Sequence, residues 1–227
     1  MHDIEVNGAI VVQVNHCEFK YNKHQAGYIH GATIVAAPNI ETSKVLIPTV
    51  LAAAIVHDQS FTNISTWQFF NVVFQDNQEA MALSTSSNND HSHTLILSES
   101  YFINDTGKQN AGALYVQQFA WVVIINCNFF NNSVGRGSGG INYHQCPSTK
   151  CYIKIVNNTF VGNKAITRSE KGHLNFWHGG ALYIYSSSKN SVGNLMITCS
   201  ISRCRFVANI AGLTGGAILI HAPVLLH

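Results

Sequence analysis

Asp76, Glu79 and Asp105 are the acidic residues whose spacing suggests chemistry, because they fall in the same turn of neighbouring copies of a repeat. Glycoside hydrolysis requires two carboxylates that flank one bond, about 5 to 9.5 Å apart. The chain has only 11 acidic residues, and they are scattered along the sequence. We therefore interpret these three as solvated turn residues and expect no catalytic residue.

Two pairs of histidines are close enough in sequence to chelate a metal ion together. They are His91 with His93 and His173 with His178, among 12 histidines in all. Neither pair matches the ligand set of a recognisable zinc site. We interpret them as exposed loop residues and expect neither a metal nor another cofactor.

Tyr115, Tyr143 and Tyr183 are predicted to occupy one position of a strand in three successive copies of the repeat. If that position faces outward, the rings form a ladder about 4.8 Å apart that suits stacking on sugars or on a partner. If it faces inward, the rings belong to the core. Asn142 and His144 favour the inward alternative, and the aliphatic neighbours in the other copies favour the outward one.

The cysteines indicate one disulfide and several buried thiols. Cys146 and Cys151 bracket a short inserted loop and can be joined if their Cβ atoms approach to about 4 Å. Cys17, Cys127 and Cys204 share one position of the repeat, where a thiol acts as a small core residue.

Three asparagines are candidate N-glycosylation sites. Asn63, Asn104 and Asn131 each begin an Asn-x-Ser/Thr triplet, and Asn157 begins a fourth in a predicted bend. These triplets favour a secreted or cell-surface protein. The first residues have no signal-peptide pattern, so the protein is either intracellular or a piece of a longer chain. We favour the piece, because the sequence stops directly after a predicted core strand without a polar cap, and we expect no transmembrane segment.

The strongest pattern is a repeated Phe-x-x-Asn motif, with Phe-x-x-Asp as one variant copy. The phenylalanines are Phe19, Phe74, Phe102, Phe129, Phe160 and Phe206, and the asparagines are Asn22, Asn77, Asn132, Asn163 and Asn209. Successive phenylalanines are 55, 28, 27, 31 and 46 residues apart, so the longer gaps must carry insertions. A period near the shortest of these spacings is typical of a solenoid.

Each copy also contains two further strands. Apolar residues stand seven and five positions before each phenylalanine, with the spacing of a strand that buries one face. The phenylalanine is an odd number of residues away, so a bend must lie between; Asn71, Asn126 and Asn157 occupy it in three copies. A glycine–alanine strand follows most copies. Its glycines are Gly112, Gly140, Gly180 and Gly216.

Three short strands per unit predict one coil of a parallel β-helix, in which each strand pairs with its counterpart one rung away. The predicted fold class is all-β, a single-stranded right-handed parallel β-helix (solenoid) of about six rungs, because crossovers between parallel strands are overwhelmingly right-handed. Residues 1–227 form one domain. Lateral insertions are expected near 36–62, 84–93, 145–151, 165–177 and 186–194. The first is either a degenerate rung or a lateral loop.

Phe-x-x-Asn paired with Gly-Gly-Ala-Ile/Leu resembles the repeat of the chlamydial polymorphic outer membrane proteins and of related large extracellular proteins. The resemblance covers about Val12 to Ile220. It implies a right-handed β-helix and a role as an adhesin or another surface protein.

The composition narrows the function further. Only 11% of the residues are charged and the formal net charge is +2, which argues against a nucleic-acid partner. We expect a non-catalytic extracellular or cell-surface module that acts as an adhesive or structural scaffold, with glycans or cell-surface proteins as partners. The alternative is a carbohydrate-active enzyme, a polysaccharide lyase or glycosidase, on the same fold.

Overall fold

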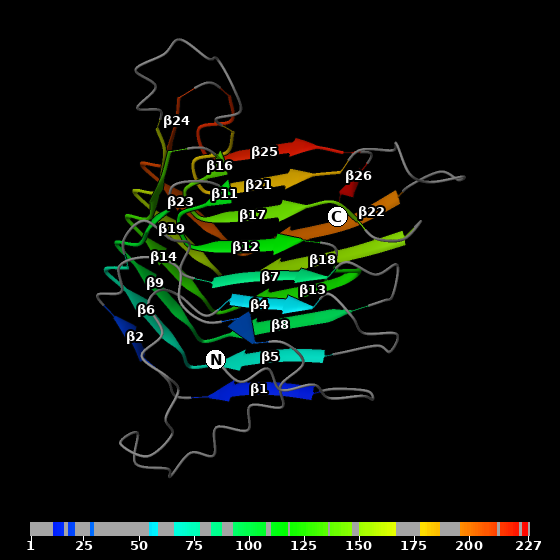
Figure 1. Cartoon of the computed structure of the whole chain (residues 1–227). Coiled ribbons are helices and arrows are strands. Elements are labelled where there is room, and N and C mark those ends of the chain that lie inside the picture. Colours follow the sequence, from blue (N-terminus) through cyan, green and yellow to red (C-terminus); the bar gives the residue numbers. More distant parts are fainter. Residues whose placement is uncertain are drawn as a thin grey trace.

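The structure is a computed structural model in which every regular element is a β-strand. It describes residues 11–15, 18–20, 28–29, 55–58, 66–77, 83–87, 93–107, 110–117, 119–135, 137–146, 150–166, 178–186, 196–212, 214–222 and 224–226. All strand pairs among these residues are parallel, and sequentially distant strands lie side by side (Figure 1). The prediction of an all-β fold is therefore confirmed for the described part of the chain.

The first sheet collects the aliphatic strands that precede each phenylalanine. Its seven strands lie in the order β1–β5–β8–β13–β18–β22–β26. They are β1 (Val11–Asn15), β5 (Thr66–Phe70), β8 (Thr94–Ser98), β13 (Trp121–Ile125), β18 (Lys150–Val156), β22 (Met196–Ser202) and β26 (Val224–Leu226).

The phenylalanine sheet contains the short strands of the Phe-x-x-Asn motif. Its six strands lie in the order β2–β6–β9–β14–β19–β23. They are β2 (Glu18–Lys20), β6 (Val73–Gln75), β9 (Tyr101–Ile103), β14 (Asn128–Phe130), β19 (Thr159–Val161) and β23 (Arg205–Val207).

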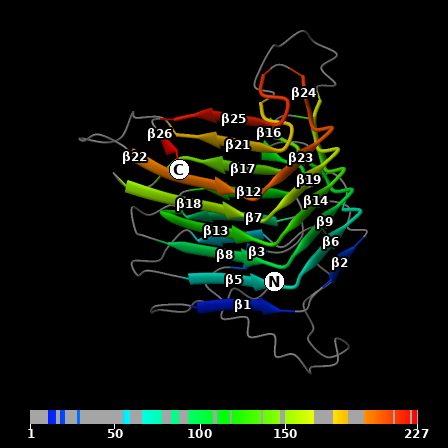
Figure 2. The ribbon, with the colours of Figure 1, turned by 180° about the vertical axis from the view of Figure 1, so that it is seen from behind.

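The glycine–alanine sheet lies at the front of Figure 1, and the first sheet lies at the front of Figure 2, so these two sheets cover opposite sides of the molecule. The strand order of the glycine–alanine sheet is β25–β21–β17–β12–β7–β4–β3. The strands are β3 (Tyr28–Ile29), β4 (Ile55–Asp58), β7 (Leu83–Ser87), β12 (Leu114–Gln117), β17 (Ile141–His144), β21 (Leu182–Tyr185) and β25 (Ile218–His221).

Two smaller sheets lie along the chain between the phenylalanine strand and the glycine–alanine strand. One has the order β10–β15–β20–β24, and the other contains β11 and β16. These strands are β10 (Thr106–Gly107), β15 (Ser133–Val134), β20 (Lys164–Ala165), β24 (Ile210–Ala211), β11 (Asn110–Ala111) and β16 (Gly137–Ser138).

The phenylalanines of successive copies stack directly on one another in the core. The ring centroids from Phe74 through Phe160 follow at 4.8 Å, and Phe160 and Phe206 are 4.9 Å apart. The planes of neighbouring rings differ by no more than 13°. Phe19 pairs with Phe74 in the same register. The predicted superposition of the repeat copies is therefore correct in this sheet.

The predicted bend before each phenylalanine has the expected left-handed backbone. The φ angles of Asn71, Asn126 and Asn157 are 51°, 56° and 55°, and Glu99 and Arg203 adopt the same conformation at 52° and 54°. Asparagine tolerates this region well, because its side chain can hydrogen-bond locally. The bend lets the buried residues before it and the phenylalanine after it both face the core.

The predicted alignment of the third glycine–alanine strand is wrong by one residue. Tyr143 pairs with Val116 and Ile184, not with Tyr115 and Tyr183. A shift of one residue moves every side chain of a strand to the opposite face. The core decides the register here, because it places Ile141 opposite Leu114 and Leu182 of the two neighbouring strands.

The same shift corrects the expected role of Gly140. This residue lies opposite Ala181, and Gly139 takes the position equivalent to Gly180. A side chain on Gly140 would collide with the carbonyl oxygen of Ala181, and one on Gly180 would collide with that of Gly216. Glycine is required at these positions because neighbouring rungs approach closely.

Two predicted insertions contain strands of the glycine–alanine sheet. β7 occupies the beginning of the 84–93 segment, and β4 lies inside the 36–62 segment and pairs with both β3 and β7. The prediction of an insertion near 84–93 missed β7, because the serine-rich sequence of this strand has no apolar alternation. Among the described residues, the 36–62 segment contributes β4 to the glycine–alanine sheet alone, because β1 pairs directly with β5 and β2 pairs directly with β6. Residues 147–149, 167–177 and 187–195 of the other insertions, and Asn22, lie outside the described residues.

Candidate binding surfaces

Trp121, which is exposed, and Tyr152, which is partly buried, form an aromatic pair on the outer face of the first sheet. Both precede an inward residue, Val122 or Ile153, and therefore point outward by strand alternation. They are direct partners across β13 and β18, and their ring centroids are 4.6 Å apart with planes inclined by 35°. Half of the surface of Trp121 (50%) is exposed, so a flat ligand can reach its ring.

The neighbours of the aromatic pair extend this surface along the same column. Thr94 and Thr198 pair with Trp121 and Tyr152, and Leu225 follows Thr198 and is 48% exposed. Hydroxyl groups beside stacked rings suit a ligand that has both polar edges and an apolar face. The sequence contained the signal for this surface, because outward positions alternate with the buried pairs, but the prediction of a ring surface concerned only the tyrosines of the other sheet.

The outer face of the glycine–alanine sheet is also rich in rings, but it is recessed. Tyr115 and Tyr183 point outward there, yet each is only 8% exposed. The Tyr115 hydroxyl donates to Oε1 of Gln117 at 3.2 Å, and burial raises the pKa of Tyr115 to about 12. These two tyrosines are therefore neither core residues nor an open ladder.

Histidines interleave with the tyrosines on this second face, and together they form the tyrosine–histidine face: Tyr115, His144, Tyr183, Tyr185 and His221. His144 stacks on Tyr185 with centroids 5.1 Å apart, and Tyr185 meets His221 edge-on at 5.5 Å. Burial lowers the pKa of His144, because the charged imidazolium is poorly solvated there. The imidazole of His144 is thus kept neutral against the aromatic rings.

Tyr143 lies on the opposite, inward face of the same strand. It is 1% exposed, and its hydroxyl donates to the carbonyl oxygen of Phe119 at 2.7 Å. Desolvation raises its pKa far above the ordinary value. Tyr143 is a core residue, and the structure separates it from the two tyrosines with which it was grouped.

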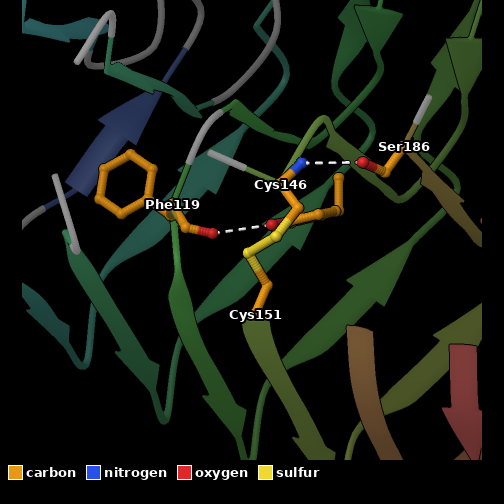
Figure 3. Close-up of a disulfide and its surroundings, with 5 residues drawn as sticks. Phe119, Cys146, Cys151 and Ser186 are labelled. Carbon is orange, nitrogen blue, oxygen red and sulfur yellow. Dashed lines mark hydrogen bonds between the residues drawn. A yellow bond between two sulfur atoms is a disulfide. The ribbon is translucent and has the colours of Figure 1, made fainter. Parts of the chain in front are cut away.

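Cys146 and Cys151 form a disulfide beside this core, with Cα atoms 6.0 Å apart (Figure 3). The backbone N–H of Cys146 donates to Oγ of Ser186 at 3.1 Å, which ties β17 to the end of β21. Cys127 is a buried free thiol whose pKa burial raises to about 12, and Cys204 is a partly buried one. Cys17 lies outside the described residues.

The asparagines of Phe-x-x-Asn point inward and form a hydrogen-bonded column. The backbone N–H and Nδ2 of Asn132 both donate to Oδ1 of Asn163, at 3.1 and 3.0 Å. Asn163 repeats this arrangement toward Asn209, at 3.0 Å for both bonds. Nδ2 of each also donates to a phenylalanine carbonyl oxygen of the preceding rung. These bonds pair the side-chain amides of Asn132 and Asn163 with the neighbouring copies of the repeat.

Asp105 occupies one position of this column and is not the solvated turn residue that was predicted. It is fully buried, and its Oδ1 accepts from the backbone N–H and Nδ2 of Asn77 at 3.1 and 2.7 Å. Its Oδ2 takes the place of an amide nitrogen and has no hydrogen-bond partner among the described residues. Burial raises the pKa of Asp105 to about 8, and repulsion from Asp76 adds a smaller increase.

The two described acids of the predicted group, Asp76 and Asp105, lie in different surroundings. Asp76 aligns with Asn104, whose Nδ2 donates to its Oδ1 at 3.1 Å, while Asp105 lies inside the turn. Glu79 is outside the described residues. Burial of Asp105 without a described partner for Oδ2 favours its protonated form.

Only one histidine of each predicted pair is described. His93 is buried, not exposed as predicted, and His178 is partly buried with its Nδ1 2.6 Å from Oγ1 of Thr214. His91 and His173 lie outside the described residues. Where the chain is described, no cluster of three or more His, Cys, Asp or Glu side chains is arranged to hold a metal ion.

The candidate glycosylation sites that are described lie at the surface. Asn104 and Asn131 are exposed and adopt left-handed backbone angles of 56° and 54°. Asn157 is exposed too, and its Nδ2 donates to Oδ1 of Asn126 at 2.9 Å. Asn63 is outside the described residues.

Comparisons with protein-family models, with curated proteins and with solved structures each found no match to this chain. Among the described residues there is also no helix with the length and hydrophobicity needed to cross a membrane.

Proposed function

We propose that residues 1–227 form one right-handed parallel β-helix domain of about six rungs with lateral loops, and that it acts as a non-catalytic adhesive or structural scaffold outside the cell or at its surface. The parallel pairing of equivalent strands and the stacked phenylalanines support the β-helix. The right hand follows from the general chirality of parallel crossovers. The resemblance to the chlamydial polymorphic outer membrane protein repeat supports the adhesive role.

The observation that carries the binding role is the exposed ring of Trp121, which contacts the partly buried Tyr152. An exposed ring held against a second ring on a sheet is suited to the apolar faces of sugar rings, because little side-chain entropy remains to be lost on binding. We propose glycans as the ligand class. The disulfide and the exposed sequons support an extracellular location, since disulfides persist in oxidising compartments and such triplets are acceptors in secreted proteins.

A glycan array probed with the labelled chain tests this proposal, and Trp121→Ala should lower the signal of the bound glycans by about tenfold, the loss of roughly one stacking contact. Tyr101→Ala is the matched control, because Tyr101 is a similarly exposed ring (40%) on β9, away from the first sheet. An array without bound glycans, or equal losses for both variants, would remove the glycan-binding role.

The same glycans also test the enzyme alternative. Acidic and neutral polysaccharides incubated with the chain should remain intact when their chain length is followed by size-exclusion chromatography. A shortened product would replace the scaffold proposal with a lyase or hydrolase.

A further inference from the structure

The charged residues of this chain are distributed unevenly along the sequence. Residues 106–227 contain ten of the 13 lysines and arginines but only one of the 11 acidic residues, Glu170, so their formal net charge is +9. Residues 1–105 contain the other three basic and ten acidic residues, a formal net charge of −7. The overall charge of +2 therefore conceals a basic half of the sequence. β13, β18 and β22, which carry and flank the Trp121–Tyr152 pair, belong to this basic half.

Two lysines of β18 lie on the same face of the first sheet as the aromatic pair. Lys150 is exposed and Lys154 is partly buried, and both alternate with the inward residues of the strand, as Tyr152 does. Each lysine stands two residues from Tyr152, which is about 7 Å along a strand. A ligand on the aromatic pair therefore comes within reach of an ammonium group on a flexible stem.

The described part of this face carries no carboxylate that competes with a ligand for the lysines. The described outward residues of β5, β8, β13, β18 and β22 are polar, apolar or basic, and none of them is acidic. Glu99 is exposed, but it lies in the bend after β8, five residues beyond Thr94, the partner of Trp121. This is roughly 15 Å along the strand, longer than the Debye length of about 8 Å in physiological salt. The lysines therefore make the potential around the aromatic pair favourable for an anion.

We propose that the surface around Trp121 and Tyr152 selects acidic glycans, with a carboxylate or sulfate group paired to Lys154 while a neighbouring sugar ring covers Trp121. This selectivity depends on the glycan-binding role proposed above. Lys154 pairs with Val123, two residues after Trp121, so the Cα atoms of Lys154 and Trp121 are about 8 Å apart on the diagonal between adjacent strands. The ammonium group supplies three donors and a compact charge, and the ring supplies an apolar surface. A neutral glycan can use only the ring.

Labelled hexasaccharides that differ in charge test this selectivity. The acidic probes are hyaluronan and chondroitin sulfate hexasaccharides, and the neutral probes are carboxyl-reduced hyaluronan hexasaccharide and chitohexaose. Fluorescence anisotropy of each probe is followed as the full chain is added in about 0.05 M salt. We expect the acidic probes to bind at least about fivefold more tightly than the neutral ones. The preference should shrink in about 0.5 M salt, because the ions screen the lysines, while binding of the neutral probes should change little.

Lys154→Gln tests the assigned residue, because glutamine keeps much of the aliphatic stem and removes the charge. It should weaken binding of the acidic probes at least about threefold and change binding of the neutral probes by less than about 1.5-fold. Lys164→Gln is the matched control. Lys164 is exposed on β20, which belongs to another sheet, and its substitution changes the net charge equally. It should change the affinity for any probe by less than about 1.5-fold.

The outcomes separate this selectivity from glycan binding itself. Equal affinity for acidic and neutral probes, binding of neutral glycans alone, or equal losses for Lys154→Gln and Lys164→Gln would overturn the acidic selectivity and leave the glycan-binding role. No binding of any probe, together with an array without bound glycans, would remove both. A labelled single-stranded oligothymidylate serves as a non-sugar polyanion. If it bound as tightly as the acidic probes, the face would be assigned to nucleic acid and the proposal would be wrong.

Discussion

The outer faces of the two large sheets both carry aromatic rings, but they differ in access. On the first sheet Trp121 is half exposed and its ring lies against that of Tyr152. On the glycine–alanine sheet, Tyr115 and Tyr183 are 8% exposed and lie among histidines. The comparison teaches that an outward position in a sheet does not make a binding surface. The first face leaves a ring accessible to a ligand, and the second covers its rings.

The largest expected effect comes from the inward side of the glycine–alanine sheet. Tyr143→Ala should reduce the free energy of unfolding by about 3–5 kcal/mol, because it leaves a cavity and removes the donor to the Phe119 carbonyl oxygen. Urea unfolding followed by circular dichroism measures this loss. Tyr185→Ala, on the outward side of the next strand, should cost far less, and equal losses would contradict the corrected register.

The asparagine column belongs to the turn that follows each phenylalanine strand. Asp105 occupies one position of this column and makes the stability of the protein depend on pH. The folded pKa of about 8 exceeds the ordinary value of 3.8, so the folded chain binds more protons between these pH values, and stability should fall as pH rises through this window. Asp105→Asn should remove this loss and stabilise the protein by about 1–3 kcal/mol at pH 8–9. It should change little near pH 4.

Thermal or urea unfolding of the two proteins across this pH range checks the sign. Asp76→Asn is the matched control, because it removes a neighbouring charge that contributes only a smaller part of the pKa increase. A wild-type stability that rises from pH 4 to pH 8 while Asp105→Asn stays level would contradict the protonated carboxyl.

The outer rings of the two sheets differ in solvent exposure, so their removal should change the free energy of unfolding by different amounts. Tyr183→Ala removes a covered ring and should cost about 1–3 kcal/mol, whereas Trp121→Ala should cost about 1 kcal/mol or less. Chemical denaturation of both variants measures the two losses. If Trp121→Ala proved the more destabilising, the aromatic pair would be a packing element and not a free surface.

The smallest effect concerns the titration of the tyrosine–histidine face. The pKa of His144 is lowered in the folded state, so His144 contributes stability above its ordinary pKa, and this contribution is lost as pH falls through the folded pKa. An NMR titration of the imidazole measures this pKa. The contribution of His144 to stability is best measured in the Asp105→Asn variant, since Asp105 changes stability with pH in the opposite direction. The pKa of His144 should rise toward its ordinary value in Tyr185→Ala, which uncovers one side of the ring.

Much of the phenylalanine sheet could be predicted from the sequence, because Phe-x-x-Asn recurs with only small changes and a ring is unmistakable at its position. The bends at Asn71, Asn126 and Asn157 followed from the odd spacing between two buried residues. The glycine–alanine strands were harder to align. Gly139 and Gly140 allow two alignments that differ by one residue, and serine-rich β7 has no apolar pattern at all.

The candidate surface shows the same limit. Strand alternation places both Trp121 and Tyr115 outward, so the local pattern cannot rank them as binding residues. Their exposure depends on the groups that pack around each ring, and these come from other rungs.

The sequence by itself determined the repeat, its bends and the residues that stack in the core, because these depend on spacing within one unit of chain. Only the tertiary structure decided that Tyr143 is inside, that Asp105 is buried in a column of amides and that Trp121 remains open. Each of these properties is set by the neighbouring rungs, which fix register, desolvation and access through contacts between residues about one repeat apart.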